Sequence, residues 1–148
     1  MDQTSTRIRK ARRSDAERIA QLSGELGYPA TAAQIATRLR QLKPASKHAV
    51  FVAESSDAAG LVGWLHVSVS HLLESDIRAE VNGLIVAEGQ RSAGAGAKLL
   101  ETAEQWARRH GCRAMNVRSN VIRERAHKFY EKHGYEHYKT QKAFRKAL

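Results

Sequence analysis

The chain has 148 residues, 42% of them hydrophobic, and its 25 lysines and arginines against 15 acidic residues give a formal net charge of +10. This composition excludes a disordered chain and fits one folded domain over residues 1–148, and no apolar run reaches the roughly 18–20 residues of a membrane span. The single cysteine, Cys112, excludes an intramolecular disulfide and any site built from several cysteines.

The N-terminus lacks the apolar stretch of a signal peptide, so we expect a cytoplasmic enzyme or binding module. The positive charge either attracts an anionic partner or forms an arginine-rich surface without a specific partner. Nucleic acid, an acidic membrane and a phosphorylated cofactor all qualify as anionic partners, so charge alone does not separate them.

The N-terminal part is predicted to form a short strand over residues 6–11 and then two helices. Ser14 and Glu17 have the spacing of a capping box at the start of the first helix, which Gly27 ends. Thr31 and Gln34 repeat this spacing at the start of the second helix. The apolar stripes at helical spacing are Ile19, Leu22 and Leu26, and then Ile35, Leu39 and Leu42, before Pro44.

The rest of the chain is predicted to alternate between strands and helices. Strands are expected over residues 48–54, 61–70, 77–86 and 113–119. A helix after the segment 88–96 runs to Gly111, with Leu99, Leu100, Ala103, Trp106 and Ala107 on one face, and a second helix covers 123–133. Residues 135–148 are expected to be extended, as one long bent strand or as two strands with a turn at 139–141.

This order of elements predicts the α/β class, with a mixed central sheet of six or seven strands flanked by about four helices. The strands on either side of residues 87–112 are expected to be parallel, because a helix lies between them, and joined by a right-handed crossover.

Two glycines, Gly94 and Gly96, follow Arg91 at the junction between a strand and the long helix. A dinucleotide-binding loop would need glycine in place of Leu99, and a Walker A loop beginning at Gly89 would need lysine in place of Ala95. The free N–H groups and the dipole of a helix start still favour a bound anion. The alternative is a tight turn in which the glycines serve packing only.

Two segments together resemble the GNAT superfamily of acetyl-CoA-dependent N-acetyltransferases. Residues 91–96 match its R-x-x-G-x-G signature, and residues 126–135 resemble its A-x-x-F/L-Y-E-x-x-G-F/Y helix and turn. With the order of elements, the resemblance covers essentially the whole chain. It implies the GNAT fold, with parallel strands splayed at the cofactor site, and transfer of the acetyl group of acetyl-CoA to a primary amine by direct attack in a ternary complex, without a metal.

The resemblance also implies which residues bind coenzyme A. The pyrophosphate is expected at the backbone of Arg91, Ser92, Ala93, Gly94, Ala95, Gly96 and Ala97, although many members have glycine where this chain has Ser92. The pantetheine arm is expected to pair with the backbone of Leu84, Ile85 and Val86, where Gly83 would ease a bulge. The asparagine that touches the arm in many members is replaced by Arg123, and Asn120 lies three residues earlier, so either residue is a candidate.

Tyr130 and Glu80 are the expected catalytic residues. Tyr130 matches the family tyrosine that donates a proton to the leaving thiolate; the alternative is a core aromatic beside Phe129. A free amine has a pKa of about 10 and must lose a proton before it attacks. Glu80, six residues before Val86 and on its face by strand periodicity, resembles the base of some members; the alternative is a solvated glutamate, with waters as the base. The Val86 N–H is the expected oxyanion donor.

The acceptor amine is expected between the two N-terminal helices and the loop after the third strand, at about residues 24–33 and 70–78 by family precedent. Glu74, Asp76 and Glu80 would attract a cationic amine there, or are ordinary surface charge. Cys112 is expected to be a buried core thiol.

Two other functions stay open. One is a coenzyme A-binding sensor or scaffold without turnover. The other is a nucleic-acid-binding module, which charge alone supports, since no recognisable motif accompanies it. We expect no membrane partner, and a homodimer through the C-terminal strand.

Overall fold

The structure is a computed structural model that describes residues 5–25, 27–56, 60–90 and 94–148. It divides into an N-terminal unit, Met1–Val117, and a C-terminal unit, Arg118–Leu148, each of which is described by itself. The single domain expected over residues 1–148 stays a prediction. No helix in the described ranges is long and apolar enough to cross a membrane.

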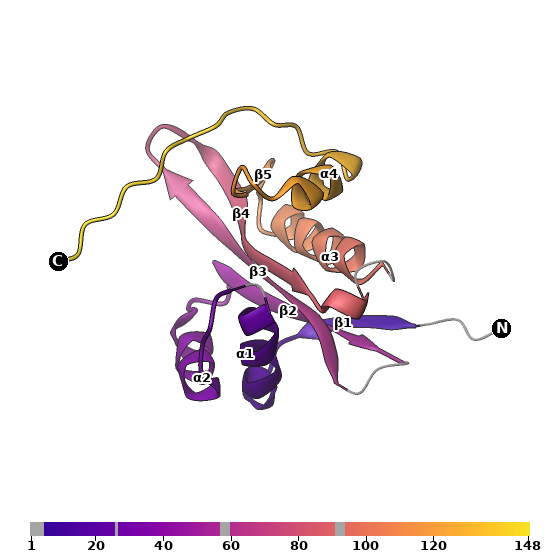
Figure 1. The fold of residues 1–148 in the computed structure, drawn as a ribbon. Coiled ribbons are helices and arrows are strands. Elements are labelled where there is room, and N and C mark those ends of the chain that lie inside the picture. The colour runs from indigo at the N-terminus through magenta and orange to yellow at the C-terminus, as the bar shows by residue number, and fades with distance from the viewer. Residues whose placement is uncertain (1–4, 26, 57–59, 91–93) are drawn as a thin grey trace. The chain divides into compact units, whose positions relative to one another are not determined.

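The N-terminal unit contains one mixed sheet (Figure 1). Its strands are β1 (Thr6–Lys10), β2 (His48–Ser55), β3 (Leu61–Leu72), β4 (Ser75–Val86) and β5 (Met115–Val117), and they lie side by side in that order. Strands β1 to β4 pair antiparallel, and β4 pairs parallel with β5. The expected parallel pair is therefore confirmed, and the helix α3 (Ala95–Arg109) connects its two strands.

Helices cover both faces of this sheet (Figure 1). On one face, α1 (Ala16–Glu25) and α2 (Ala32–Gln41) bury an apolar cluster that includes Ile19, Leu22, Val52 and Ile85. On the other face, α3 buries all five side chains expected from its periodicity, Leu99, Leu100, Ala103, Trp106 and Ala107. The mixed α/β architecture expected from the sequence is thus confirmed.

The predicted start of the second helix is confirmed, and that of the first is corrected. Thr31 Oγ1 accepts a hydrogen bond from the Gln34 N–H, and Gln34 Oε1 accepts one from the Thr31 N–H. Before α1 a short 3-10 turn (Arg13–Asp15) intervenes, and Asp15, rather than Ser14, accepts the Arg12 N–H at 2.7 Å.

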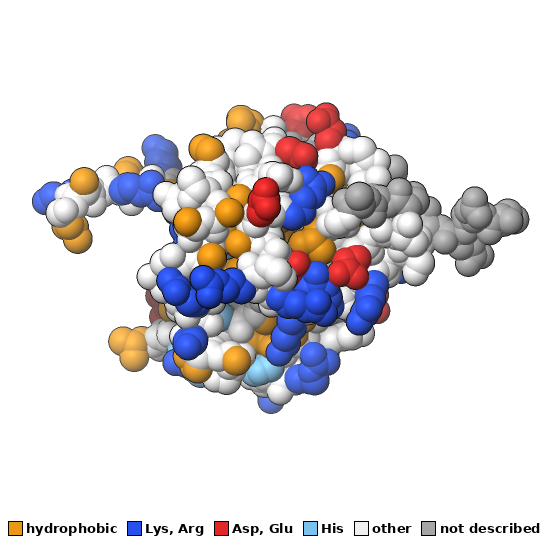
Figure 2. Space-filling model, turned by 90° about the horizontal axis from the view of Figure 1, so that it is seen from below, with side chains coloured by type: hydrophobic (Ala, Val, Ile, Leu, Met, Phe, Trp, Pro, Cys, Tyr) orange, Lys and Arg blue, Asp and Glu red, His pale blue; other side chains and the backbone are white. Residues whose placement is uncertain are grey.

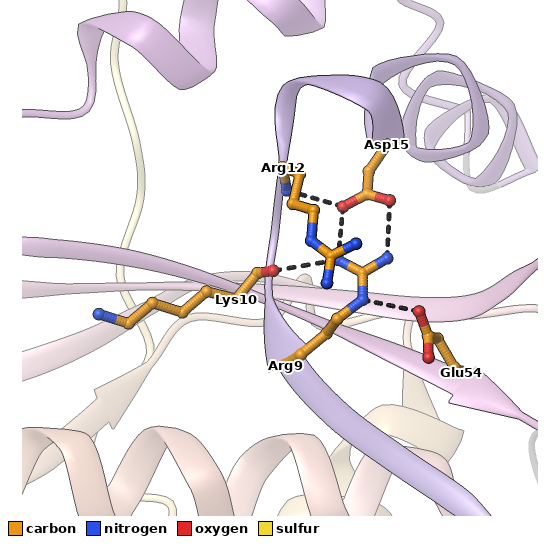
Figure 3. A network of polar contacts seen from close by, with 5 residues as sticks. All are labelled: Arg9, Lys10, Arg12, Asp15 and Glu54. Atoms are coloured by element: carbon orange, nitrogen blue, oxygen red, sulfur yellow. Dashed lines mark hydrogen bonds and ion pairs between the residues drawn. The ribbon is translucent and has the colours of Figure 1, made fainter.

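Asp15 accepts this bond because Arg9 of β1 fixes its carboxylate in place (Figure 3). The Arg9 guanidinium donates to both carboxylate oxygens of Asp15, at 2.8 and 2.9 Å, and through Nε to Glu54 of β2 at 2.6 Å. Hydrogen bonding from Arg9 holds the pKa of Asp15 below its ordinary value. This network joins β1, β2 and the start of α1.

The C-terminal unit contains α4 (Glu124–Lys132), and residues 135–148 form neither helix nor strand. The expected C-terminal strand is therefore wrong for this structure, and the sheet of the described residues has five strands instead of six or seven. A strand exists only where its backbone N–H and C=O groups pair with another strand, and no strand of the described chain includes residues 135–148.

Candidate active site

Strand β4 is interrupted by a β-bulge at Asn82. Glu80 pairs with Ser68 and Val81 with Val67, but the next pair on β3, His66, faces Gly83, so that Asn82 is an extra residue on β4. The bulge lies directly beside Gly83, as expected. The parallel register with β5 covers Ala79 to Val81 only, so the two parallel strands pair over three residues before the bulge.

The bulge corrects one expectation about the site. Periodicity placed Glu80 and Val86 on the same face of the strand, but the extra residue reverses the alternation between them. Glu80 pairs with Ser68 and Ile85 with Trp64, all on the face covered by α1 and α2, whereas Val86 pairs with Gly63 on the other face. A Cβ atom at Gly63 would lie 3.3 Å from the Val86 side chain and 3.2 Å from Leu99 of α3, which supports the same division.

Glu80 is a buried carboxylate, with 8% of the residue exposed. The strand register aligns it with two further polar residues in one row, since His48 of β2 faces Ser68 of β3, and Ser68 faces Glu80. The Ser68 hydroxyl accepts a hydrogen bond of 2.7 Å from the Asn82 amide at the bulge. His48 and Ser68 were not predicted as neighbours of Glu80, because only the register of three strands brings them together.

Two histidines lie against each other at the end of this row. His48 Nδ1 and His66 Nε2 are 3.3 Å apart, and the rings stack with their centroids 5.5 Å apart. Burial, together with the neighbouring His48, lowers the pKa of His66 to about 4, so that His66 is neutral at pH 7. His48 is partly exposed at the start of β2.

The residues expected to hold coenzyme A lie around the end of β4 and the start of α3. Leu84, Ile85 and Val86 are the last three residues of β4, as the resemblance required. Gly94 has a left-handed conformation (φ +83°) at the N-cap of α3, and Ala95, Gly96 and Ala97 form its first turn. The first N–H groups of a helix have no partner within the helix, which suits them to an anion. Arg91, Ser92 and Ala93 lie outside the described residues.

In the C-terminal unit, Tyr130 is a partly buried phenol on α4. Its ring makes edge contacts with Phe129 and Tyr135, with centroids 5.3 and 5.7 Å apart. Burial raises the pKa of Tyr130, and the positive charge of Arg123 partly opposes this shift. The phenol therefore keeps its proton at neutral pH.

The two candidates for the pantetheine contact lie at the start of α4. Arg123 is the N-cap residue, and its N–H donates to the Asn120 carbonyl at 3.0 Å. The Asn120 side chain accepts the Ile122 N–H at 3.2 Å, so it closes the turn that precedes the helix. These bonds fix the local turn and leave open which residue contacts the cofactor.

The remaining candidates have simpler positions. Glu74 lies in the turn between β3 and β4, Asp76 is the second residue of β4, and both are exposed. Cys112 is buried, as expected, and burial raises the pKa of its thiol. No group of three or more potential metal ligands is found within the described ranges. Figure 2 shows Lys and Arg side chains spread over the surface on the side of α1 and α2, in keeping with the net charge.

Comparison with known proteins identifies the family. Residues 10–135 match the model of the acetyltransferase (GNAT) family. The chain belongs to the GNAT acetyltransferase family. It is 31% identical over 124 residues to the aminoalkylphosphonate N-acetyltransferase of Salmonella typhimurium, and the match covers 82% of this chain and 77% of that protein. The protein is accordingly an enzyme of the acetyltransferase class, as the resemblance implied.

Solved GNAT structures share its fold. The aminoglycoside N-acetyltransferase AAC(6')-Iy in complex with CoA has a TM-score of 0.83 and 18% identity, covering 98% of this chain and 97% of that chain. Glucosamine-6-phosphate N-acetyltransferase from Arabidopsis thaliana has a TM-score of 0.79 and 19% identity, covering 95% and 98%. These similarities confirm the GNAT fold.

Proposed function

We propose that this GNAT protein transfers the acetyl group of acetyl-CoA to the primary amine of a small molecule, by direct attack on the thioester in a ternary complex. The observation that carries the proposal is the buried carboxylate of Glu80, which lies on the strand that leads through Leu84 to Val86 into the left-handed turn at Gly94. One strand thus connects a candidate base with the expected cofactor segment.

Coenzyme A would bind mainly through backbone groups. The first N–H groups of α3, from Gly94 to Ala97, suit the pyrophosphate, and the family resemblance adds Arg91, Ser92 and Ala93. The backbone of Leu84, Ile85 and Val86 would pair with the pantetheine arm, with Asn120 or Arg123 as a further contact. The Val86 N–H would donate to the developing oxyanion.

The family resemblance supplies two candidates for proton transfer, Glu80 and Tyr130. Glu80 accepts a proton from the acceptor ammonium, so that the neutral amine attacks the carbonyl carbon. Tyr130, which is protonated at neutral pH, donates to the sulfur as the C–S bond breaks.

We propose an aminoalkylphosphonate as the first acceptor to test, because the relative from Salmonella typhimurium bears that name. Arg78 offers a partner for the phosphonate. It lies on the face of Glu80 and two residues away, about 6.6 Å along the strand. Its Nε is buried without a hydrogen-bond partner among the described residues. A guanidinium binds phosphonate oxygens well, because its N–H groups form parallel, charge-assisted bonds.

The deciding experiment measures release of free coenzyme A thiol from acetyl-CoA with a panel of amines. We expect turnover with a primary amine and the highest kcat/KM with 2-aminoethylphosphonate, compared with ethanolamine as the matched amine without phosphorus. Binding of acetyl-CoA without thiol release for any amine would instead support a sensor or scaffold. Failure to bind acetyl-CoA, with binding to nucleic acid, would support the remaining alternative.

A separate variant tests whether the acceptor carries a phosphonate. Arg78→Gln should raise KM for 2-aminoethylphosphonate by about 10- to 100-fold, the loss expected for hydrogen bonds to a charged group, and leave KM for ethanolamine unchanged. Arg7→Gln removes an exposed arginine of β1 and serves as the matched control. An equal change for both amines would contradict a phosphonate contact.

We also propose that residues 136–148 pair with a second copy of the chain. All of these residues are exposed and lack secondary structure, and the large apolar side chains among them, Tyr138, Phe144 and Leu148, fall on positions of one parity together with Thr140, Lys142 and Lys146. One face of an extended chain would therefore carry all three apolar side chains, and an extended segment can add as a strand to another sheet. Light scattering should show a dimer for the full chain and a monomer for Phe144→Lys. A monomeric wild-type protein would contradict the proposal.

A further inference from the structure

We propose that Ser68 and His48 carry away the proton that Glu80 removes from the acceptor amine, and that His66 positions His48 for this task. The inference rests on the proposed acetyl transfer and adds to it a route by which the proton reaches solvent. It is carried by the row of side chains across β2, β3 and β4 and by the contact between the two histidines.

The register makes this row continuous. In an antiparallel sheet, directly opposite residues point to the same face, with Cβ atoms about 4.5–5.5 Å apart. Glu80 faces Ser68, and Ser68 faces His48, so Ser68 is the middle residue of the row. The Asn82 amide donates to the Ser68 oxygen, which leaves the hydroxyl proton of Ser68 available for donation.

The residues of the row become more exposed from Glu80 to His48, which gives proton transfer an outward direction. Glu80 and Ser68 are 8% and 9% exposed, whereas His48 is partly exposed at the start of its strand. An imidazole is suited to the last position, because its ring nitrogens can accept and donate a proton. A proton that leaves Glu80 would therefore pass outward along the row.

His66 has the properties of a positioning residue. Its Nε2 is 3.3 Å from His48 Nδ1, so one nitrogen donates to the other, and this bond fixes the ring orientation and tautomer of His48. Because burial keeps His66 neutral at pH 7, it does not retain the proton itself. With Nδ1 of His48 held by His66, the other ring nitrogen, Nε2, takes the proton from Ser68 and then releases it to water.

Several other charged and titratable side chains lie on this face of the sheet. The titratable and charged side chains on this face of the strands include His48, His66, Asp76, Arg78 and Glu80. Farther toward β1 lie Arg7 and the ion pairs of Arg9 with Asp15 and Glu54, and Arg18 of α1 is on the same side. Among them, His48 is the charge that acts on the pKa of His66.

Every proton of the proposed reaction has a source and a destination. The acceptor enters as an ammonium ion and gives one proton to Glu80. The amine nitrogen then forms a bond with the carbonyl carbon, the C–S bond breaks, and the second proton of the nitrogen ends on the leaving sulfur. The net product besides the amide and the thiol is one proton, which leaves Glu80 through Ser68 and His48 to water.

Chemical rescue tests the inference. His48→Ala should lower kcat by about 10- to 100-fold below pH 7, within the range for loss of a proton-transfer group, and added imidazole should restore the rate. Ser68→Ala should show the same loss of kcat, which added imidazole should not restore. His66→Asn should move the acid limb of the pH–rate profile and keep the affinity for acetyl-CoA. The control is His110→Ala, whose ring stacks on Trp106 at the end of α3 and which should show neither a pH-dependent loss nor rescue.

The outcomes separate the two proposals. A wild-type rate for His48→Ala across the pH range would overturn the relay and leave the acetyltransferase proposal intact, as would a lowered rate that imidazole fails to restore. Absence of turnover in the wild-type protein with every amine would reject the proposed function and the relay together.

Discussion

The indole ring of Trp64 lies where the side chain of residue 83 would be. A Cβ atom added to Gly83 would be 2.8 Å from Cη2 and 2.9 Å from Cζ3 of Trp64. Glycine is therefore required there by the close approach of a neighbouring ring, beside the bulge that redirects β4. Trp64 itself packs against the apolar cluster under α1 and α2, so it has little freedom to move aside.

Gly83→Ala should consequently lower the free energy of unfolding by about 1–3 kcal/mol, because the new methyl group overpacks a filled site. Urea unfolding measures this. Gly24→Ala is the control, since nothing lies within 4 Å of a Cβ atom there, and alanine inside α1 should stabilise the protein by roughly 0.5–1 kcal/mol. Equal stability of both variants would show that Trp64 moves freely.

Gly94 and Gly111 form a matched pair for the pyrophosphate contact. Both are left-handed (φ +83° and +82°), and a Cβ atom at either position would meet nothing within 4 Å. Alanine at each should therefore cost a similar backbone strain of about 1–2 kcal/mol. Isothermal titration should show at least about 10-fold weaker binding of acetyl-CoA for Gly94→Ala alone, because only its Cβ blocks the approach of a phosphate to the helix start. Unchanged affinity would remove the pyrophosphate from this turn.

Tyr130→Phe should lower kcat by about 10²- to 10⁴-fold, the range for loss of a general acid, with little change in the Kd for acetyl-CoA. The phenyl ring keeps the contacts with Phe129 and Tyr135, so the fold of α4 should persist. Tyr138→Phe removes an exposed hydroxyl and is the control. A wild-type kcat in Tyr130→Phe would show that sulfur leaves without this proton.

Glu80→Gln should lower kcat/KM most at low pH, where almost all of the acceptor amine is protonated and a base is most needed. The loss should shrink as the pH approaches about 10, the ordinary pKa of the amine. The pH–rate profile measures this, with Glu101→Gln on the exposed side of α3 as the control. A loss of the same size at every pH would argue against a base.

Asp15→Ala should destabilise the protein by about 1.5–3 kcal/mol at pH 7, because it removes the charge-assisted hydrogen bonds of the partly buried Arg9 guanidinium. The pKa of Asp15 is lowered in the folded protein, so its stabilisation is present above the unfolded value and is lost as the pH falls toward the folded one. The difference from wild type should therefore narrow below about pH 4 in urea unfolding experiments. Glu17→Ala, at an exposed position of α1, should change stability little at either pH.

The sequence predicted elements whose signals are local. The capping box of Thr31 and Gln34 was correct because both of its bonds join residues three apart. The buried face of α3 was correct because helical periodicity depends on one segment alone. Ser14 was a wrong choice over Asp15, because Asp15 is held by Arg9 of β1, which in turn is bonded to Glu54 of β2.

The candidate site depended more on contacts between distant segments. The position of Glu80 and the end of β4 followed from motifs, but the row through Ser68 and His48 needs the register of three strands. The strand expected over residues 135–148 failed for a related reason, since an extended sequence forms a strand only where a partner strand exists.

The extra residue at Asn82 divides β4 into two halves whose alternation is out of phase. A regular strand of the same residues, with Asn82 paired to His66, would turn Ile85 toward α3 and Val86 toward α1 and α2. The direction of Glu80 relative to the cofactor segment is thus set by the bulge and not by hydrophobicity. In GNAT chains of similar composition, the presence or absence of this bulge would distinguish two geometries of the same strand.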